Sequence, residues 1–133
     1  MRVDVFLDRI VDDGIRAARR EYAARPDELR GAVGGFAACR RSTPAEIAEL
    51  LASARRIARE ASAQGQVASF WEARFRAIFW VADCLSAAIE GAPAPPIVPP
   101  TARGYVKAAE VLSGLLSRPS RRLARASQEA TVT

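Results

Sequence analysis

The sequence contains no histidine and only two cysteines, Cys39 and Cys84, among its 133 residues. Without an imidazole, the chain lacks the Ser-His-Asp triad, the Cys-His dyad and the common zinc sites. Two cysteines far apart in the chain form no disulfide framework, which favours free buried thiols and a reducing, cytoplasmic environment. We therefore expect a protein that binds no metal or cofactor and acts through binding rather than catalysis.

Aromatic residues are also scarce, at 7% of the chain, and no apolar run reaches the roughly 18 residues that a membrane span requires. Asp4 and Asp8 lie where a secretory signal would need an uncharged core. The hydrophobic half of the chain consists mainly of alanine, leucine, isoleucine and valine. Alanine is the best helix former and is depleted in strands, so we expect an all-α protein that does not contact a membrane.

Apolar residues recur at intervals of three and four over residues 3–24, 26–40, 44–64 and 67–90, the spacing of one helical face. Pro26 separates the first two segments, because proline ends one helix and suits the first position of the next. Thr43 and Glu46 form a capping box that marks the start of the third helix. Thr101 can cap a fifth helix over about 102–117. The sequence therefore predicts a compact all-α bundle of four to five helices in one domain, residues 1–117.

Three glycines, Gly31, Gly34 and Gly35, fall inside the second predicted helix. Each costs about 1 kcal/mol relative to alanine in a helix interior, because glycine loses more backbone freedom on folding. This pattern indicates either a kink in the helix or a neighbouring backbone that packs closely against it.

The segment 67–90 is apolar around most of its circumference and has only a narrow polar strip. A helix of this kind is buried by neighbours on several sides, so we expect it at the centre of the bundle. One of its two apolar faces becomes the seam of a homo-oligomer if the other helices are too few or too short to cover it. The residues of this candidate interface are Ala73, Ala77, Trp80 and Cys84.

Five prolines occur in the nine residues 92–100, and the segment carries no charge. Such a composition predicts an extended, polyproline-like strap before the last helix. The strap can serve as a ligand for an aromatic groove on another protein. Because Ile97 and Val98 are apolar, we favour packing of the strap across the chain's own bundle.

The formal net charge is +5, and much of it comes from the last sixteen residues. This C-terminal tail, residues 118–133, is expected to be solvated, or to follow a nucleic-acid backbone in a salt-sensitive manner. The preference for arginine over lysine is also what a biased codon composition would produce. The nucleic-acid candidates are Arg118, Arg121, Arg122 and Arg125.

Cations also occur in the first turns of the predicted fifth helix, where the helix dipole disfavours positive charge. An anion bound at the helix start would resolve this conflict, with free backbone amides as further donors. The alternative is neutralisation of the only lysine by Glu110, three positions further on. The candidate anion site consists of Thr101, Arg103, Gly104 and Lys107.

Arg74 lies at the edge of the apolar arc of the segment 67–90, where an unpaired charge is costly. We predict a buried ion pair with a carboxylate from the first or second helix. Stacking of the guanidinium on Trp71 and an anionic ligand are the alternatives.

Asp4, Asp8 and Asp12 line one side of the first predicted helix, four positions apart, followed by Arg16 and Arg20. Three carboxylates could gather a divalent cation. A solvated face with an Asp12–Arg16 pair accounts for the same pattern, so we predict no metal site.

These observations favour a small interaction or assembly module that self-associates or binds a protein partner. A nucleic-acid-associated protein that uses the arginine tail is the alternative. A protein that binds an anionic small molecule at the start of the last helix is the third hypothesis.

Overall fold

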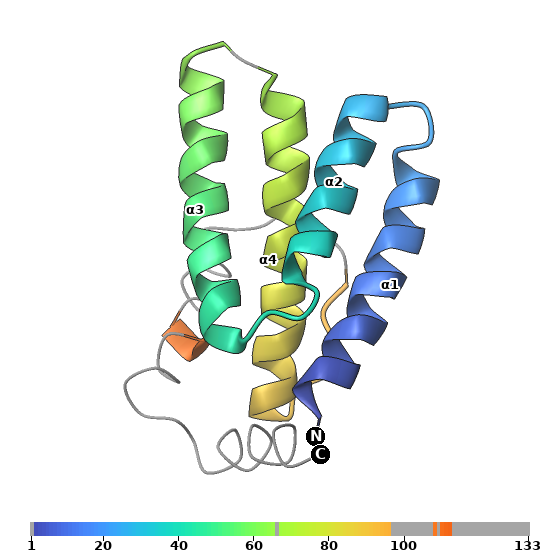
Figure 1. Ribbon diagram of the computed structural model, residues 1–133, viewed down its shortest axis with the longest axis vertical. Helices are drawn as coiled ribbons and strands as arrows, with labels where there is room; N and C mark the ends of the chain where they lie inside the picture. Colours follow the sequence, from blue (N-terminus) through green and yellow to red (C-terminus); the bar gives the residue numbers. More distant parts are fainter. Residues whose placement is uncertain (1, 66, 97–107, 109, 113–133) are drawn as a thin grey trace.

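The computed structural model describes residues 2–65, 67–96, 108 and 110–112, and the regular elements of this part are helices. The four long helices are α1 (Val3–Glu21), α2 (Pro26–Cys39), α3 (Pro44–Ala63) and α4 (Ala68–Glu90). Consecutive helices run in opposite directions, with α3 and α1 at the two edges and α4 and α2 between them (Figure 1). The predicted all-α bundle is confirmed.

The helix boundaries follow from local chemistry that the sequence carries. The Thr43 side chain accepts a hydrogen bond from the Glu46 amide, and the Glu46 carboxylate accepts one from the Thr43 amide, each at 3.2 Å. This capping box confirms the predicted start of α3. The first helix ends three residues earlier than predicted, at Glu21, because the chain turns back there and the Arg25 amide donates to the Tyr22 carbonyl.

The last predicted helix lies largely outside the described residues. Residues 108 and 110–112 are helical, in agreement with the prediction for 102–117. Ala108 and Leu112, one helical turn apart, are both buried in the core. This short described stretch therefore packs one apolar face against the bundle.

The glycines of α2 allow its backbone to lie directly on α4. A Cβ at Gly31 would collide with the Phe70 carbonyl, and one at Gly35 would lie 2.6 Å from the Arg74 carbonyl oxygen. Gly31 and Gly35 are four residues apart and therefore share one helical face. Since α2 is continuous from Pro26 to Cys39, the structure selects close backbone packing over a kink.

α4 is the central helix, as predicted. α2 and α3 pack along it, whereas α1 packs mainly on α2 and reaches α4 at one edge. The core residues of α4, such as Ile78, Val81 and Leu85, are fully buried. They meet Leu7 of α1 and Leu51 of α3 in a single hydrophobic cluster.

The candidate interface on α4 is covered by the chain itself. Ala73, Ala77 and Cys84 are each at most 3% exposed. The Trp80 ring packs edge-on against Phe36 of α2, with ring centroids 5.9 Å apart. An oligomer interface on this face was predicted only if the other helices left it uncovered. The glycines of α2 bring that helix close enough to cover it, so this requirement is not met.

The proline-rich strap begins on the same surface. The indole Nε1 of Trp80 donates a hydrogen bond to the Pro95 carbonyl oxygen at 3.1 Å. The described part of the strap, residues 92–96, thus contacts the chain's own bundle, as we favoured from the sequence. The rest of the strap lies outside the described residues.

Candidate functional site

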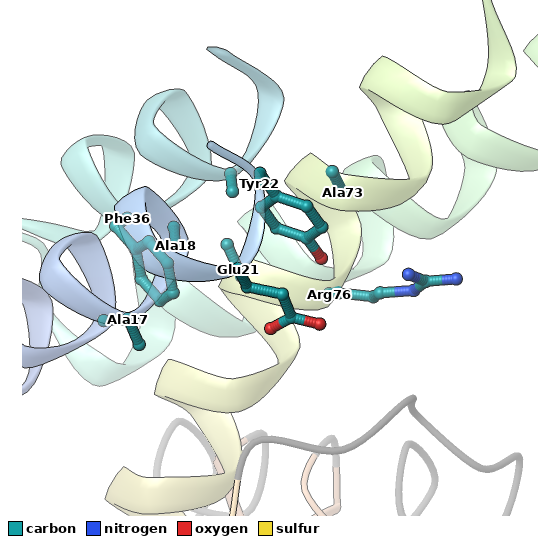
Figure 2. Close-up of a pocket in the computed structure, with 10 residues that line it drawn as sticks. Ala17, Ala18, Glu21, Tyr22, Phe36, Ala73 and Arg76 are labelled. Carbon is teal, nitrogen blue, oxygen red and sulfur yellow. The ribbon is translucent and has the colours of Figure 1, made fainter. Parts of the chain in front are cut away.

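A small cleft lies where α1, α2 and α4 meet, and it has a volume of about 60 Å³. Figure 2 shows the cleft with the side chains that line it. Its walls are mostly alanine and glycine, two aromatic rings bound it, and two charged side chains stand at its rim. The lining residues are Gly14, Ala17, Ala18, Glu21, Tyr22, Ala32, Phe36, Ala73, Arg76 and Ala77.

The cleft exists because small residues face one another on three helices. Gly14 leaves room for the Phe36 ring, since a Cβ at this glycine would collide with the ring carbons. Ala17 and Ala18 on α1 then line the cleft together with Ala73 and Ala77 on α4, and the described residues leave the space between them empty. In a protein interior at normal packing density, larger side chains would close such a gap.

The rim of the cleft carries two opposite charges. Glu21 belongs to the last turn of α1 and Arg76 to α4, and both side chains are exposed. Within the described part of the chain, neither residue forms a salt bridge, with the other or with a third residue. Figure 2 shows the Glu21 carboxylate and the Tyr22 hydroxyl on one side of the cleft, with Arg76 extending away from them. The rim therefore offers a hydrogen-bond acceptor and a donor that remain available.

A second hollow, of about 350 Å³, lies between the end of α2 and the start of α3. It is wider and more open to solvent, and two of its polar side chains, Ser42 and Glu46, are already engaged. The Glu46 carboxylate serves the capping box, and the Ser42 hydroxyl donates to the Ala38 carbonyl oxygen at 2.9 Å. We therefore consider the cleft between α1, α2 and α4 the better candidate site.

Arg74 is half-buried beside α2, and its Nη1 atom lies 3.4 Å from the position of a Cβ at Gly34. Among the residues that the structure describes, no carboxylate lies within salt-bridge distance of Arg74. The predicted ion pair is therefore not formed with the described parts of the first and second helices. The absence of a Cβ at Gly34 gives the long side chain a path along α2.

The aspartates of α1 hold an arginine instead of a metal ion. Arg40, at the end of α2, donates to Asp12 at 2.6 Å and to Asp8 at 3.4 Å. The hydrogen bond to Asp12, together with the charges of both carboxylates, raises the pKa of Arg40. Arg16 pairs with Asp13, so the predicted Asp12–Arg16 pair is wrong. In the described ranges, no three ligand-type side chains gather as a metal site would need.

The two thiols are buried away from the cleft. Burial raises the pKa of both Cys39 and Cys84 to about 12, and the charge of Arg74 opposes this shift at Cys39. Both groups therefore stay protonated at neutral pH. A neutral, inaccessible thiol is a poor nucleophile, so neither cysteine is a candidate for covalent catalysis.

Two candidate sites from the sequence fall outside the described residues. One is the anion site of Thr101, Arg103, Gly104 and Lys107. The other is the nucleic-acid site of Arg118, Arg121, Arg122 and Arg125. Both stay predictions.

The cleft itself was missed at the sequence level. Glu21 and Arg76 have the pattern of solvated residues, and Ala73 and Ala77 were predicted as part of an oligomer interface rather than as walls of a cleft. The sequence feature that could have revealed the cleft is the number of small residues on two helices that face each other. These are Gly14, Ala17 and Ala18 on α1 and Ala73 and Ala77 on α4. Only the helix pairing shows that these positions face one another.

The chain matches no family model, no curated protein and no solved structure. None of the helices in the described residues is long and apolar enough to cross a membrane. We therefore argue function from the geometry of the cleft.

Proposed function

We propose that this protein is a non-enzymatic helical interaction module that binds its partner group in the cleft between α1, α2 and α4. The observation that carries the proposal is an apolar cleft that the described residues leave unfilled, with two oppositely charged side chains at its rim that form no salt bridge within the described part of the chain. Binding sites for small groups combine apolar walls with a few polar side chains in this way.

The side chains at the cleft support binding better than catalysis. The lining residues provide one carboxylate, one guanidinium and one phenol, and none of them is a serine, threonine, cysteine or lysine. A carboxylate or a phenol can also act as a nucleophile, but covalent catalysis pairs the nucleophile with a group that activates it. Among the described residues, no hydrogen bond links the side chain of Glu21 or Tyr22 to such a group. The cleft is therefore better suited to holding a group than to transforming it.

The binding surface of the module overlaps only in part with the one first expected, since it includes Ala73 and Ala77 but not Trp80 and Cys84. Self-association was predicted through the Trp80 face, but α2 and the strap occupy that face. A partner that binds at the cleft needs no rearrangement of these contacts. Self-association through another surface stays a prediction.

The five alanines that line the cleft provide the test. We would label the chain with ¹³C at alanine methyl groups and add isobutanol, isobutylamine and isobutyrate, each of which carries one short aliphatic group. The expected result is a shift of the Ala17, Ala18, Ala32, Ala73 and Ala77 resonances by at least one of these probes. Alanines elsewhere in the chain should remain unshifted.

A blocked variant provides the control. Ala17→Leu places a larger side chain in the half-buried wall of the cleft, whereas Ala52→Leu makes the same change at an exposed position of α3. Ala17→Leu should abolish the shifts and Ala52→Leu should preserve them, with circular dichroism confirming that both variants fold. If no probe shifts the cleft methyl groups, or if Ala17→Leu binds as the parent does, the proposed function is wrong.

A further inference from the structure

We infer that the group bound in the cleft is a free α-amino acid with a short aliphatic side chain. This inference rests on the proposed function of the same cleft and specifies its ligand. It follows from the two charges at the rim, the size of the cleft and the apolar character of its walls.

The charges select a dipolar ligand. The Glu21 carboxylate attracts an ammonium group, and the Arg76 guanidinium binds a carboxylate, often through two hydrogen bonds. A ligand with a single charge would be attracted by one of these groups and repelled by the other. A zwitterion is attracted by both. The exposed Arg76 side chain, which extends away from Glu21 in Figure 2, must turn toward the cleft to bind the ligand carboxylate. The Tyr22 hydroxyl, on the same side as Glu21, can donate to the ligand or accept from it.

The same reasoning favours a free amino acid over a segment of protein. A residue inside a polypeptide has lost both its ammonium and its carboxylate to peptide bonds. A chain terminus keeps only one of the two charges. Only the free amino acid presents both charges on the carbon that bears the side chain.

The size of the cleft limits the side chain. An engineered cavity of about 150 Å³ binds benzene, whereas this cleft has a volume of about 60 Å³. A methyl or isopropyl group therefore fits between the alanines, and a phenyl ring does not. We expect L-alanine and L-valine to bind and L-phenylalanine to be rejected.

The test is a titration of the alanine-labelled full-length chain with L-valine, compared with isobutylamine, isobutyrate and isobutanol. L-valine should bind about three- to tenfold more tightly than either singly charged compound, because each charge adds one charge-assisted contact at an exposed rim. Glu21→Gln and Arg76→Gln should each weaken the binding of L-valine by a similar factor. Both variants should weaken the binding of isobutanol less than that of L-valine, because isobutanol carries no charge and its hydroxyl can still bond to a glutamine amide.

Matched variants control for the loss of a charge elsewhere. Glu72→Gln on α4 and Arg19→Gln on α1 remove exposed charges outside the cleft lining, and L-valine should bind both as it binds the parent. If isobutanol shifts the cleft methyl groups but L-valine binds no better than the singly charged compounds, the amino-acid inference is overturned and the binding role remains. If no compound shifts them, the proposed function fails as well.

Discussion

At the scale of single residues, the turn between α2 and α3 places Arg41 in the left-handed region, with a φ of 64°. The preceding residue, Arg40, has a φ of −64° and a ψ of 132°, and the Ser42 amide donates to the Cys39 carbonyl at 3.2 Å. This is the arrangement of a type II turn, which favours glycine at the position of Arg41. An L-residue there is strained, because its Cβ approaches the following carbonyl oxygen.

Replacing Arg41 with glycine should therefore stabilise the protein. We expect Arg41→Gly to raise the free energy of unfolding by about 0.5–1 kcal/mol, the relief of strain less the greater entropy of the unfolded chain. Urea denaturation followed by circular dichroism measures this change. Arg41→Ala removes the same charge but keeps the Cβ, so it should give no such gain; equal gains in both variants would assign the effect to charge.

Single-residue pairing was the least predictable feature of the sequence. Local spacing suggested an Asp12–Arg16 pair, yet Asp12 binds Arg40, which lies 28 positions away. An exposed ion pair within a helix contributes only a few tenths of a kcal/mol, so tertiary neighbours easily displace it. Sequence spacing therefore identifies which charges share a face, but the fold decides their partners.

At the scale of helices and turns, the predictions succeeded where the chemistry is local. The capping box at Thr43 and the proline at position 26 act within one helical turn, and both fix a helix start as predicted. The sequence did not decide what the glycines of α2 are for, because glycine is typical both of a kinked helix and of a helix that packs closely against a neighbouring backbone. The apolar pattern around Trp80 predicted that this face of α4 is buried, but it did not predict which segment covers it.

Trp80 provides the test of how this face is covered. Trp80→Glu places a charge beside Phe36, between α2 and the strap, and should destabilise the protein by roughly several kcal/mol, because the carboxylate loses its hydration. Trp80→Phe keeps an aromatic ring but loses the hydrogen bond to Pro95, so we expect a loss of only about 1–2 kcal/mol. Chemical denaturation of both variants measures these losses.

A dimer seam would give a different result. Trp80→Glu would then lower the mass measured by light scattering while the monomer kept its stability. Val5→Glu is the matched control, since Val5 is 55% exposed on α1 and should tolerate the charge within about 0.5 kcal/mol. A stable, folded Trp80→Glu chain of reduced mass would contradict the coverage of this face by α2.

At the scale of the whole molecule, the bundle was predictable and the candidate site was not. The helices follow from periodicity, caps and breaks, each of which is readable within a short window of sequence. The cleft requires α1, α2 and α4 to meet with their small residues opposed, and no window contains all three. The energetic reason is that underfilling a core by a few methyl groups costs too little to prevent folding, so the composition does not reveal it.

The buried thiols report on the whole core through the pH dependence of stability. Burial raises the pKa of Cys39 and Cys84 from 9.0 in the unfolded chain to about 12 in the folded one. Below pH 9 both states are protonated, and the thiols contribute no pH dependence. Between pH 9 and 12 the unfolded state binds fewer protons than the folded state, so stability falls as the pH rises.

We therefore expect each thiol to reduce the free energy of unfolding by roughly 1 kcal/mol between pH 8 and pH 10. Urea denaturation at both pH values measures this loss in the parent and in a variant with Cys39→Ala and Cys84→Ala. The comparison uses only the change with pH, so any constant cost of the substitutions cancels. The variant should lose about 2 kcal/mol less than the parent, because its remaining alkaline titrations are the same. Equal losses would mean that the thiols ionise as readily in the folded chain as in the unfolded one, which contradicts their burial in the core.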